Sequence, residues 1–449
     1  MTLDLLLPVT PMHGHVGPLV AIGRGLVTLG HRVTVLTGRE HQPLVEANGL
    51  AFRELPEDCR ADTSRADPAP WRPRVFEGRD AVIDTFITPL DAQFRCLTTE
   101  LTRPGAHVDA VVADTAFTGA LPLLLAGAIP ERIPVLGVSV TPLAVVSVDA
   151  APFGSALQPG STEWSQRRNA RINRMLRRGP LRALHEAFDG ALAPYGVPPG
   201  RLDFFDHTLA FDATFQLSAR SMEYPRRELP DTVSFVRPPA PVHERVPLPQ
   251  WWSRLDEPLA DDRGAGPAPI VHLTQGTLDN ADLGRLIAPA IRGLADCPVR
   301  VVVSTGGRPV EALEQQLAGR LPANTLAAPF LPYAELLPRV AVMVTNGGYG
   351  GVQQALSHGI PLVVAGSTED KPEVGARVAW AGVGIDLRRG TPSPRQVRRA
   401  VTSVLEDPAY RAAAARVATD IASLDEAAEA IAHRLDAMTT HPREVRSAT

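Results

Sequence analysis

Lysine is nearly absent from this sequence of 449 residues: Lys371 is the only one among 45 basic side chains. A phosphate-binding loop that ends in Gly-Lys-Ser or Gly-Lys-Thr is therefore excluded, and a Schiff-base enzyme would have to use Lys371. Cysteine is scarce as well. Three scattered thiols, Cys59, Cys96 and Cys297, are an odd number that makes no disulfide framework and is typical of a reducing compartment.

Long apolar runs and an excess of charge are also missing. No stretch approaches the roughly 18 consecutive apolar residues that a membrane-spanning helix needs, and residues 5–7 are too short an apolar run for the core of a signal peptide. With 49 acidic against 45 basic side chains the formal net charge is −4, which argues against nucleic acid as the main partner. We therefore expect a cytoplasmic protein without stable membrane insertion.

What the chain does contain is an alternation of strand and helix patterns. The first predicted unit is βαβ, which requires a parallel sheet. Its parts are a strand at residues 3–7, a loop at 8–18, a helix at 19–29 and a strand at 32–36. The same sheet continues with strands at 109–113 and 135–140 and a helix at 116–126 between them. Residues 56–73, rich in proline, arginine and aspartate, have no period and predict a long loop.

A second set of strands and helices follows a junction rich in proline, at 238–249 and 264–269. Its predicted strands are 270–274, 299–304, 340–345 and 362–365, with a helix at 282–294. The fold class is therefore α/β, with two doubly wound, Rossmann-like lobes facing across a cleft. We divide the chain into a first lobe at 1–237, a linker at 238–266, a second lobe at 267–420, and a C-terminal helix and tail at 421–449.

The segment from Arg167 to Arg182 carries seven arginines interleaved with apolar residues. One interpretation is an amphipathic helix for a membrane surface or an anionic partner. The other, which we favour at this stage, is an ordinary helix with a solvated arginine face.

Two residues of the first lobe are candidates for acid–base chemistry. His15 lies in the loop after the first strand, and a histidine there can take up a proton near neutral pH. Asp114 ends a neighbouring strand, where its carboxylate can hold the imidazole in one tautomer. The alternatives are an incidental pair of loop histidines, a metal site made with His13, and a helix N-cap at Asp114.

Glycine-rich turns follow two strands of the second lobe. Gly276 and Thr277 come after the first of them, and the run from Asn346 to Gly351 follows another and opens a helix. Such turns let backbone N–H groups reach phosphate oxygens at a helix N-terminus, although a packing turn explains the glycines equally well. Asp370 and Lys371 follow a third strand, where carboxylates can bind sugar hydroxyls or form a plain surface turn. No Asp-x-Asp occurs, which disfavours a metal-chelated nucleotide.

In this order, the motifs resemble a family 1 glycosyltransferase of the GT-B fold, most closely the actinobacterial natural-product and macrolide type. The residues that carry the resemblance are His15 to Pro18, Asp114, Gly276-Thr277, and the stretch from Phe330 to Lys371. The resemblance implies an inverting, metal-independent transfer of a sugar from a nucleotide-diphosphate donor to a hydroxyl of a lipophilic acceptor. It implies no cofactor beyond this co-substrate, and it leaves a homodimer open.

The resemblance also implies roles for single residues. His15 would be the general base and Asp114 would orient it. Phe330, with Leu331 and Tyr333 close by, would lie beside the nucleotide base. The diphosphate would be held by Gly276, Thr277, Asn346, Gly348, Gly350 and Gly351. Gln354 would bind the ribose, and Asp370 with Lys371 the sugar hydroxyls.

Two departures from the family bear on the donor. The diphosphate motif usually begins with histidine where this chain has Asn346, and the ribose position is usually glutamate in UDP-sugar users where it has Gln354. We expect UDP-glucose or a related donor, with a dTDP-sugar as the alternative. Two other functions stay open: a nucleotide-sugar epimerase on the same scaffold, and a donor-blind auxiliary protein that binds a partner.

Overall fold

The computed structural model describes residues 1–60, 74–126, 133–242, 246–259, 267–277 and 280–440. Two sheets organise them, and every strand pairs with its neighbours in parallel. The first sheet has the order β3-β2-β1-β4-β5-β6-β7. Its strands are β1 (Asp4–Pro8), β2 (Arg32–Thr37), β3 (Ala51–Glu54), β4 (Ala110–Asp114), β5 (Val135–Ser139), β6 (Ala213–Leu217) and β7 (Val233–Val236).

The second sheet has the order β10-β9-β8-β11-β12-β13. Its strands are β8 (Ile270–Thr274), β9 (Arg300–Ser304), β10 (Thr325–Ala328), β11 (Val340–Thr345), β12 (Leu362–Val364) and β13 (Gly384–Asp386). In both sheets the chain moves outward in one direction and then returns to the other side of its first strand. Each sheet therefore has a switch point, between β1 and β4 and between β8 and β11, where a ligand can enter.

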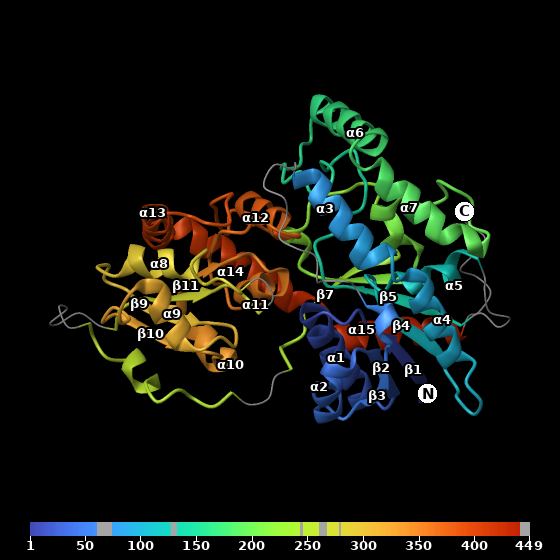
Figure 1. The fold of residues 1–449 in the computed structure, drawn as a ribbon, viewed down its shortest axis with the longest axis horizontal. Helices are drawn as coiled ribbons and strands as arrows, with labels where there is room; N and C mark the ends of the chain where they lie inside the picture. Colours follow the sequence, from blue (N-terminus) through green and yellow to red (C-terminus); the bar gives the residue numbers. More distant parts are fainter. Residues whose placement is uncertain (61–73, 127–132, 243–245, 260–266, 278–279, 441–449) are drawn as a thin grey trace.

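Helices cover both faces of each sheet (Figure 1). Those of the first part are α1 (His13–Thr28), α2 (Gln42–Ala47), α3 (Arg74–Val82), α4 (Leu90–Leu101), α5 (Leu121–Leu125), α6 (Glu163–Arg178) and α7 (Arg182–Leu192). Those of the second are α8 (Ile287–Leu294), α9 (Val310–Leu317), α10 (Tyr333–Leu336), α11 (Tyr349–Ser357), α12 (Lys371–Trp380), α13 (Pro394–Glu406), α14 (Pro408–Ser423) and α15 (Ala427–Thr440). No described helix is long and apolar enough to cross a membrane.

The central strands are buried on both faces because their side chains alternate between two apolar cores. In β1, Leu5 and Leu7 enter the core beneath α1, whereas Leu6 enters the core beneath α4. The last helix, α15, leaves the second sheet and returns to the first, where Ile431 and Leu435 join the core of β1 (Figure 1).

Three predicted helix boundaries were wrong. Helix α1 begins at His13 rather than at residue 19, and it accommodates Pro18 as its sixth residue. Between β4 and β5 the predicted helix shrinks to Leu121–Leu125, with Pro122 in its first turn. Helix α8 begins at Ile287 rather than at residue 282. Most of the predicted loop at 56–73 lies outside the described residues.

Candidate active site

His15 and Asp114 meet at the switch point of the first sheet. His15 lies in the first turn of α1, and Asp114 is the last residue of β4. Nδ1 of the imidazole is 2.9 Å from Oδ2 of the carboxylate, and both side chains are buried. The carboxylate also accepts the backbone N–H groups of Thr10 (3.2 Å) and Ala116 (3.1 Å). Three hydrogen bonds thus hold the Asp114 carboxylate in place. Because Nδ1 of His15 donates its proton to this carboxylate, Nε2 is the nitrogen that can accept a proton.

The two groups tune each other's protonation. Burial alone lowers the pKa of His15, but the charge and hydrogen bond of Asp114, together with the charge of Asp370, outweigh it and raise that pKa. Burial likewise raises the pKa of Asp114, and the facing His15 more than reverses this, so that the Asp114 pKa is lowered. The aspartate therefore stays ionised and favours proton uptake by the histidine.

The two glycine turns of the second sheet are joined by Asn346. Its Nδ2 donates to the backbone carbonyl of Gln275 (2.6 Å), and its Oδ1 accepts the backbone N–H of Gly348 (3.3 Å). Gly276 and Gly347 both have positive φ, +72° and +89°, which only glycine adopts without strain. Asparagine at this position, in place of the family's histidine, thus ties the turn after β8 to the turn after β11.

The helix that follows this turn has an open N-terminus. Gly348 is the N-cap of α11, and a Cβ added to Gly350 or Gly351 would meet no other atom within 4 Å. Side chains therefore do not crowd the first turn of this helix, and the backbone N–H groups of a helix N-terminus are suited to binding phosphate. Thr277 is exposed in the neighbouring turn. Gln354 is half-buried on the same helix, whereas Gln353 is used in a hydrogen bond to Ser218 (3.0 Å).

The predicted base-binding residues divide into one exposed ring and two packed side chains. Phe330 is 51% exposed and would contact a Cβ built on Gly307, whose φ is +92°. Leu331 is buried in the core. The Tyr333 hydroxyl is 2.9 Å from Nε2 of His272, and burial raises its pKa to about 12. Phe330 is thus the side chain of this group that is free to stack on a base.

Asp370 and Lys371 begin helix α12 after β12. Lys371 is buried and forms an ion pair with Glu369. Burial raises the pKa of Asp370 to about 6, although Lys371 acts in the opposite direction. Asp370 and His15 also shift each other's pKa, so groups from the two lobes lie close enough to interact through their charges.

Replacing Asp370 with asparagine is expected to raise stability at pH 7.5 and to lower turnover. An aspartate whose pKa is raised from 3.8 to about 6 by folding destabilises the protein above pH 6, and this penalty disappears as the pH falls to about 4. Thermal unfolding of the wild type and of Asp370→Asn, at pH 7.5 and at about pH 4, measures this difference in stability. Asp386→Asn, at another carboxyl whose pKa burial raises, should stabilise without reducing turnover. Equal midpoints for wild type and Asp370→Asn at pH 7.5 would contradict the assignment.

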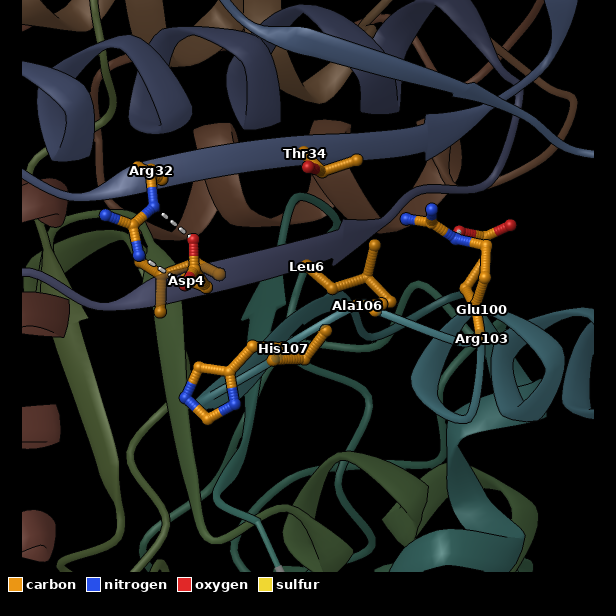
Figure 2. Close-up of a pocket in the computed structure, with 11 residues that line it drawn as sticks. Asp4, Leu6, Arg32, Thr34, Glu100, Arg103, Ala106 and His107 are labelled. Carbon is orange, nitrogen blue, oxygen red and sulfur yellow. Dashed lines mark hydrogen bonds and ion pairs between the residues drawn. The ribbon is translucent and has the colours of Figure 1, made fainter.

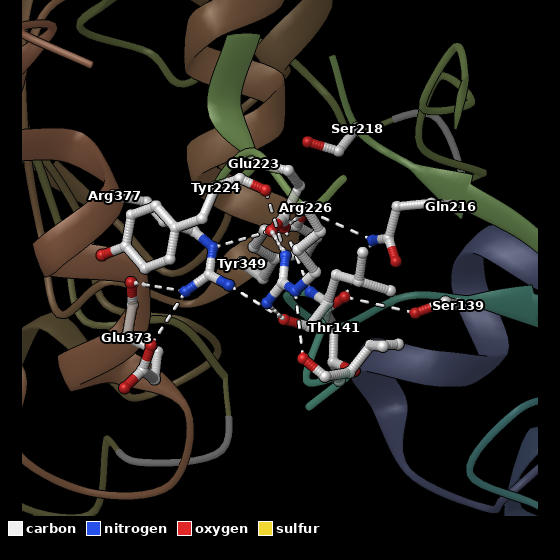
Figure 3. A network of polar contacts seen from close by, with 12 residues as sticks. Ser139, Thr141, Gln216, Ser218, Glu223, Tyr224, Arg226, Tyr349, Glu373 and Arg377 are labelled. Carbon is white, nitrogen blue, oxygen red and sulfur yellow. Dashed lines mark hydrogen bonds and ion pairs between the residues drawn. The ribbon is translucent and has the colours of Figure 1, made fainter. Parts of the chain in front are cut away.

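A buried ion network joins the two lobes beside this site (Figure 3). Arg377 of α12 donates from Nε to Glu223 (2.9 Å) and from Nη1 to Glu373 (2.9 Å), and its guanidinium lies 4.4 Å from the ring centre of Tyr224. Glu223 also accepts the hydroxyl of Tyr349, the first residue of α11 (3.1 Å). The network therefore connects the starts of α11 and α12 to the segment between β6 and β7.

The same network holds the loop after β5. The backbone of Leu143 is bound by Glu223, Arg226 and Arg377. Glu373 accepts the N–H groups of Gly154 (2.9 Å) and Ala156 (2.7 Å), two residues with positive φ that form a small anion nest. These charges were not predicted from the sequence. The spacing of Glu373 and Arg377, four residues apart on one helix, was the only signal that pointed to a pair.

A pocket lies at the edge of the first sheet opposite to the His15–Asp114 pair (Figure 2). It has a volume of about 270 Å³ and surrounds the start of β1. Asp4 forms a two-pronged ion pair with Arg32, and His107 lies 2.9 Å from Asp109. These charges satisfy one another at the amino-terminal ends of the strands, so the pocket is separate from the carboxyl edge where His15 and Asp114 meet.

Known structures share this architecture. The crystal structure of the glycotransferase of kitacinnamycin matches with a TM-score of 0.70 at 22% sequence identity, over 97% of this chain and 100% of the other. Two parallel-sheet lobes with this topology define the GT-B fold.

Sequence relatives specify the family. The family model described as "Erythromycin biosynthesis protein CIII-like, C-terminal domain" matches residues 301–438. The 4'-demethylrebeccamycin synthase of Lentzea aerocolonigenes is 37% identical over 437 residues, covering 95% of this chain and 97% of its own. UDP-glycosyltransferase 2 of Phaeomoniella chlamydospora is 34% identical over 448 residues, covering 96% and 95%. The chain belongs to the family 1 glycosyltransferases and is a glycosyltransferase enzyme.

Proposed function

We propose that the protein transfers a sugar, with inversion and without a metal ion, from a UDP-sugar such as UDP-glucose to a hydroxyl of a lipophilic natural product. The observation that carries this proposal is the buried pair at the carboxyl edge of the first sheet, in which Nδ1 of His15 lies 2.9 Å from Oδ2 of Asp114. The names of the similar proteins, UDP-glycosyltransferase and 4'-demethylrebeccamycin synthase, support a UDP-sugar and a natural-product acceptor.

The chain's own groups account for each step of the transfer. Nε2 of His15 takes the proton of the acceptor hydroxyl while the oxygen attacks the anomeric carbon from the face opposite the leaving group. The bond from that carbon to UDP breaks, and the charge on the diphosphate is stabilised by backbone N–H groups at the start of α11. Asp114 stabilises the resulting imidazolium, and Asp370 with Lys371 holds the sugar hydroxyls.

Calorimetric titration with UDP and dTDP, in the presence of EDTA, tests the donor site. We expect UDP to bind with a dissociation constant on the order of micromolar, corresponding to about 8 kcal/mol, and more tightly than dTDP. Release of UDP from UDP-glucose is then measured with a panel of phenolic and macrolide acceptors. Absence of binding to either nucleotide would favour a donor-blind auxiliary protein, and conversion of the UDP-sugar without acceptor would favour an epimerase.

Replacing Asn346 with alanine is expected to weaken UDP binding by up to about thirtyfold, since it removes two internal hydrogen bonds, worth about 1 kcal/mol each, that hold the two turns in place. Without them the turn after β8 loses its connection to the turn after β11. Asn324 is a matched control in the same lobe, because this buried asparagine donates to the carbonyls of Leu294 and Val299. Asn324→Ala should lower stability while UDP affinity stays unchanged; an equal loss of UDP affinity in both variants would refute the assigned role of Asn346.

A further inference from the structure

Helix α6 belongs to a surface that is unusually apolar for the exterior of this protein. Among the described residues, ten large apolar side chains are exposed, and five of them lie between residues 146 and 175. They are Val146, Val148, Leu157, Trp164 and Met175. Trp164 and Met175 are the most exposed of the five, at 71% and 61%. Half of the exposed large apolar side chains thus come from one segment of the chain, and two of them, Trp164 and Met175, lie on α6 itself.

The helix is attached to the first lobe through polar contacts. Asn169 donates to the carbonyl of Val148 (2.9 Å), Asn173 to that of Ser147 (3.3 Å), and Gln166 to the carboxylate of Asp149 (3.0 Å). These bonds place residues 146–149 alongside α6. Within the described part of the chain, no residue of α6 belongs to an apolar core. The helix therefore sits at the periphery of the lobe, as Figure 1 shows, and its apolar side chains stabilise little of the fold.

The charge of α6 is opposite to that of the chain. The helix carries six arginines and one glutamate, whereas the whole protein has a net charge of −4. Arg167 pairs with Glu163 (2.8 Å), and Arg177 lies 3.4 Å from Asp203. Arg171, Arg174 and Arg178 are exposed and form no ion pair with any residue that the structure describes.

Both kinds of side chain occupy the same side of the helix. Intervals of four and three residues place five side chains along one stripe of the helix. They are Trp164, Arg168, Arg171, Met175 and Arg178. The guanidinium of Arg168 lies 5.7 Å from the ring centre of Trp164. The stripe runs the length of a 16-residue helix, which is about 24 Å, with Trp164 in its first turn and Met175 in its last.

We propose that α6, together with residues 146–148, docks on the surface of an anionic lipid bilayer. Arginines can extend their apolar stems into the boundary of a bilayer while their guanidinium groups bind lipid phosphates, and tryptophan and methionine enter the apolar layer beside them. A bilayer surface is extended and offers anionic groups directly above apolar chains, which matches the mixed stripe. The helix lies on the membrane and does not span it.

This inference goes beyond the proposed sugar transfer and does not depend on it. The surface is nevertheless connected to the site, because the loop that leads into α6 is held at Gly154 and Ala156 by Glu373 of α12. A protein docked through α6 would therefore hold this loop close to the bilayer, where lipophilic molecules concentrate.

Sedimentation of the full-length protein with lipid vesicles tests the proposal. We expect binding to vesicles of equal parts phosphatidylglycerol and phosphatidylcholine at low salt, loss of that binding as the ionic strength rises, and none to phosphatidylcholine alone. The triple variant Arg171→Glu, Arg174→Glu, Arg178→Glu should bind at least about tenfold more weakly, since each arginine near an anionic surface is worth about 1 kcal/mol.

The matched control reverses the same number of exposed arginines on α13: Arg395→Glu, Arg398→Glu, Arg399→Glu. This variant changes the net charge equally and should bind vesicles like the wild type. A wild type that stays in the supernatant, or an equal loss in both triple variants, would overturn the proposal. The double variant Trp164→Ala, Met175→Ala should also bind more weakly, and unchanged binding to the vesicles would overturn the proposed docking, because it would show attraction by charge alone. Unfolding midpoints of the variants show whether they are folded.

Discussion

Replacing His15 with alanine is expected to lower kcat by about 10²–10⁴-fold, while the affinity for UDP stays at the wild-type level. The variant removes the nitrogen that takes the acceptor proton, but it leaves the glycine turns of the second lobe intact. Kinetics with saturating UDP-sugar and calorimetry with UDP measure the two quantities separately. Unchanged turnover would show that His15 is not the base, and loss of UDP binding would show a wider structural effect.

His13 is the matched control for this experiment. It lies two residues earlier in the first turn of α1, is exposed, and its ring centre is 6.3 Å from that of His41. His13→Ala changes the same residue type on the same helix without touching Asp114, so its kcat should match the wild type. Equal losses in both variants would mean that the start of α1 had been disturbed.

The pH profile gives an independent test of the pair. Because Asp114 raises the pKa of His15, the proportion of neutral base should fall as the pH is lowered through a value above 6.5. Asp114→Asn removes the charge and keeps the size of the side chain. We expect this variant to lower kcat and to move the acidic limb to lower pH, since the His15 pKa falls. An acidic limb at the same pH in both proteins would contradict the coupling between the two residues.

The location of this pair was predictable because its two parts follow neighbouring parallel strands. His15 comes shortly after β1 and Asp114 ends β4, and the carboxyl ends of adjacent parallel strands lie at one edge of a sheet. The same reasoning placed Gly276, Asn346 and Asp370 at the facing edge of the second sheet. Asn346 reaches the turn after β8 because β8 and β11 are neighbours in the sheet. The roles of these residues in the transfer remain predictions.

Other features were not predictable from local patterns. Strands β3, β6, β7, β10 and β13 were missed because their short segments lack clear turn signals. Tyr333 lies close to Phe330 in the sequence, yet its hydroxyl is bound by His272 from β8, a contact that depends on tertiary packing. Glu223 and Arg377 are more than a hundred positions apart in the sequence, so their pairing becomes visible only once both lobes are folded.

Replacing Arg377 with alanine is expected to reduce the free energy of unfolding by about 3–5 kcal/mol, because it leaves Glu223 and Glu373 buried without their shared cation. Unfolding in urea, followed by circular dichroism, measures the change. Arg227 is a suitable control, since its ion pair with Asp149 (2.8 Å) is 63% exposed on the arginine side. Arg227→Ala should leave the free energy of unfolding nearly unchanged because its ion pair is exposed to solvent, and an equally small effect of Arg377→Ala would contradict the assigned importance of the network.

The shape of the transition distinguishes a local loss from separation of the lobes. Arg377 bonds to Glu223 and to the carbonyl of Leu143 from the first lobe, and to Glu373 within its own helix. If these bonds couple the lobes, Arg377→Ala should unfold in two steps, with UDP raising only the midpoint of the second lobe, where we place the nucleotide. A single transition at lower urea, shifted as a whole by UDP, would mean that the apolar contacts and α15 keep the lobes coupled without the network.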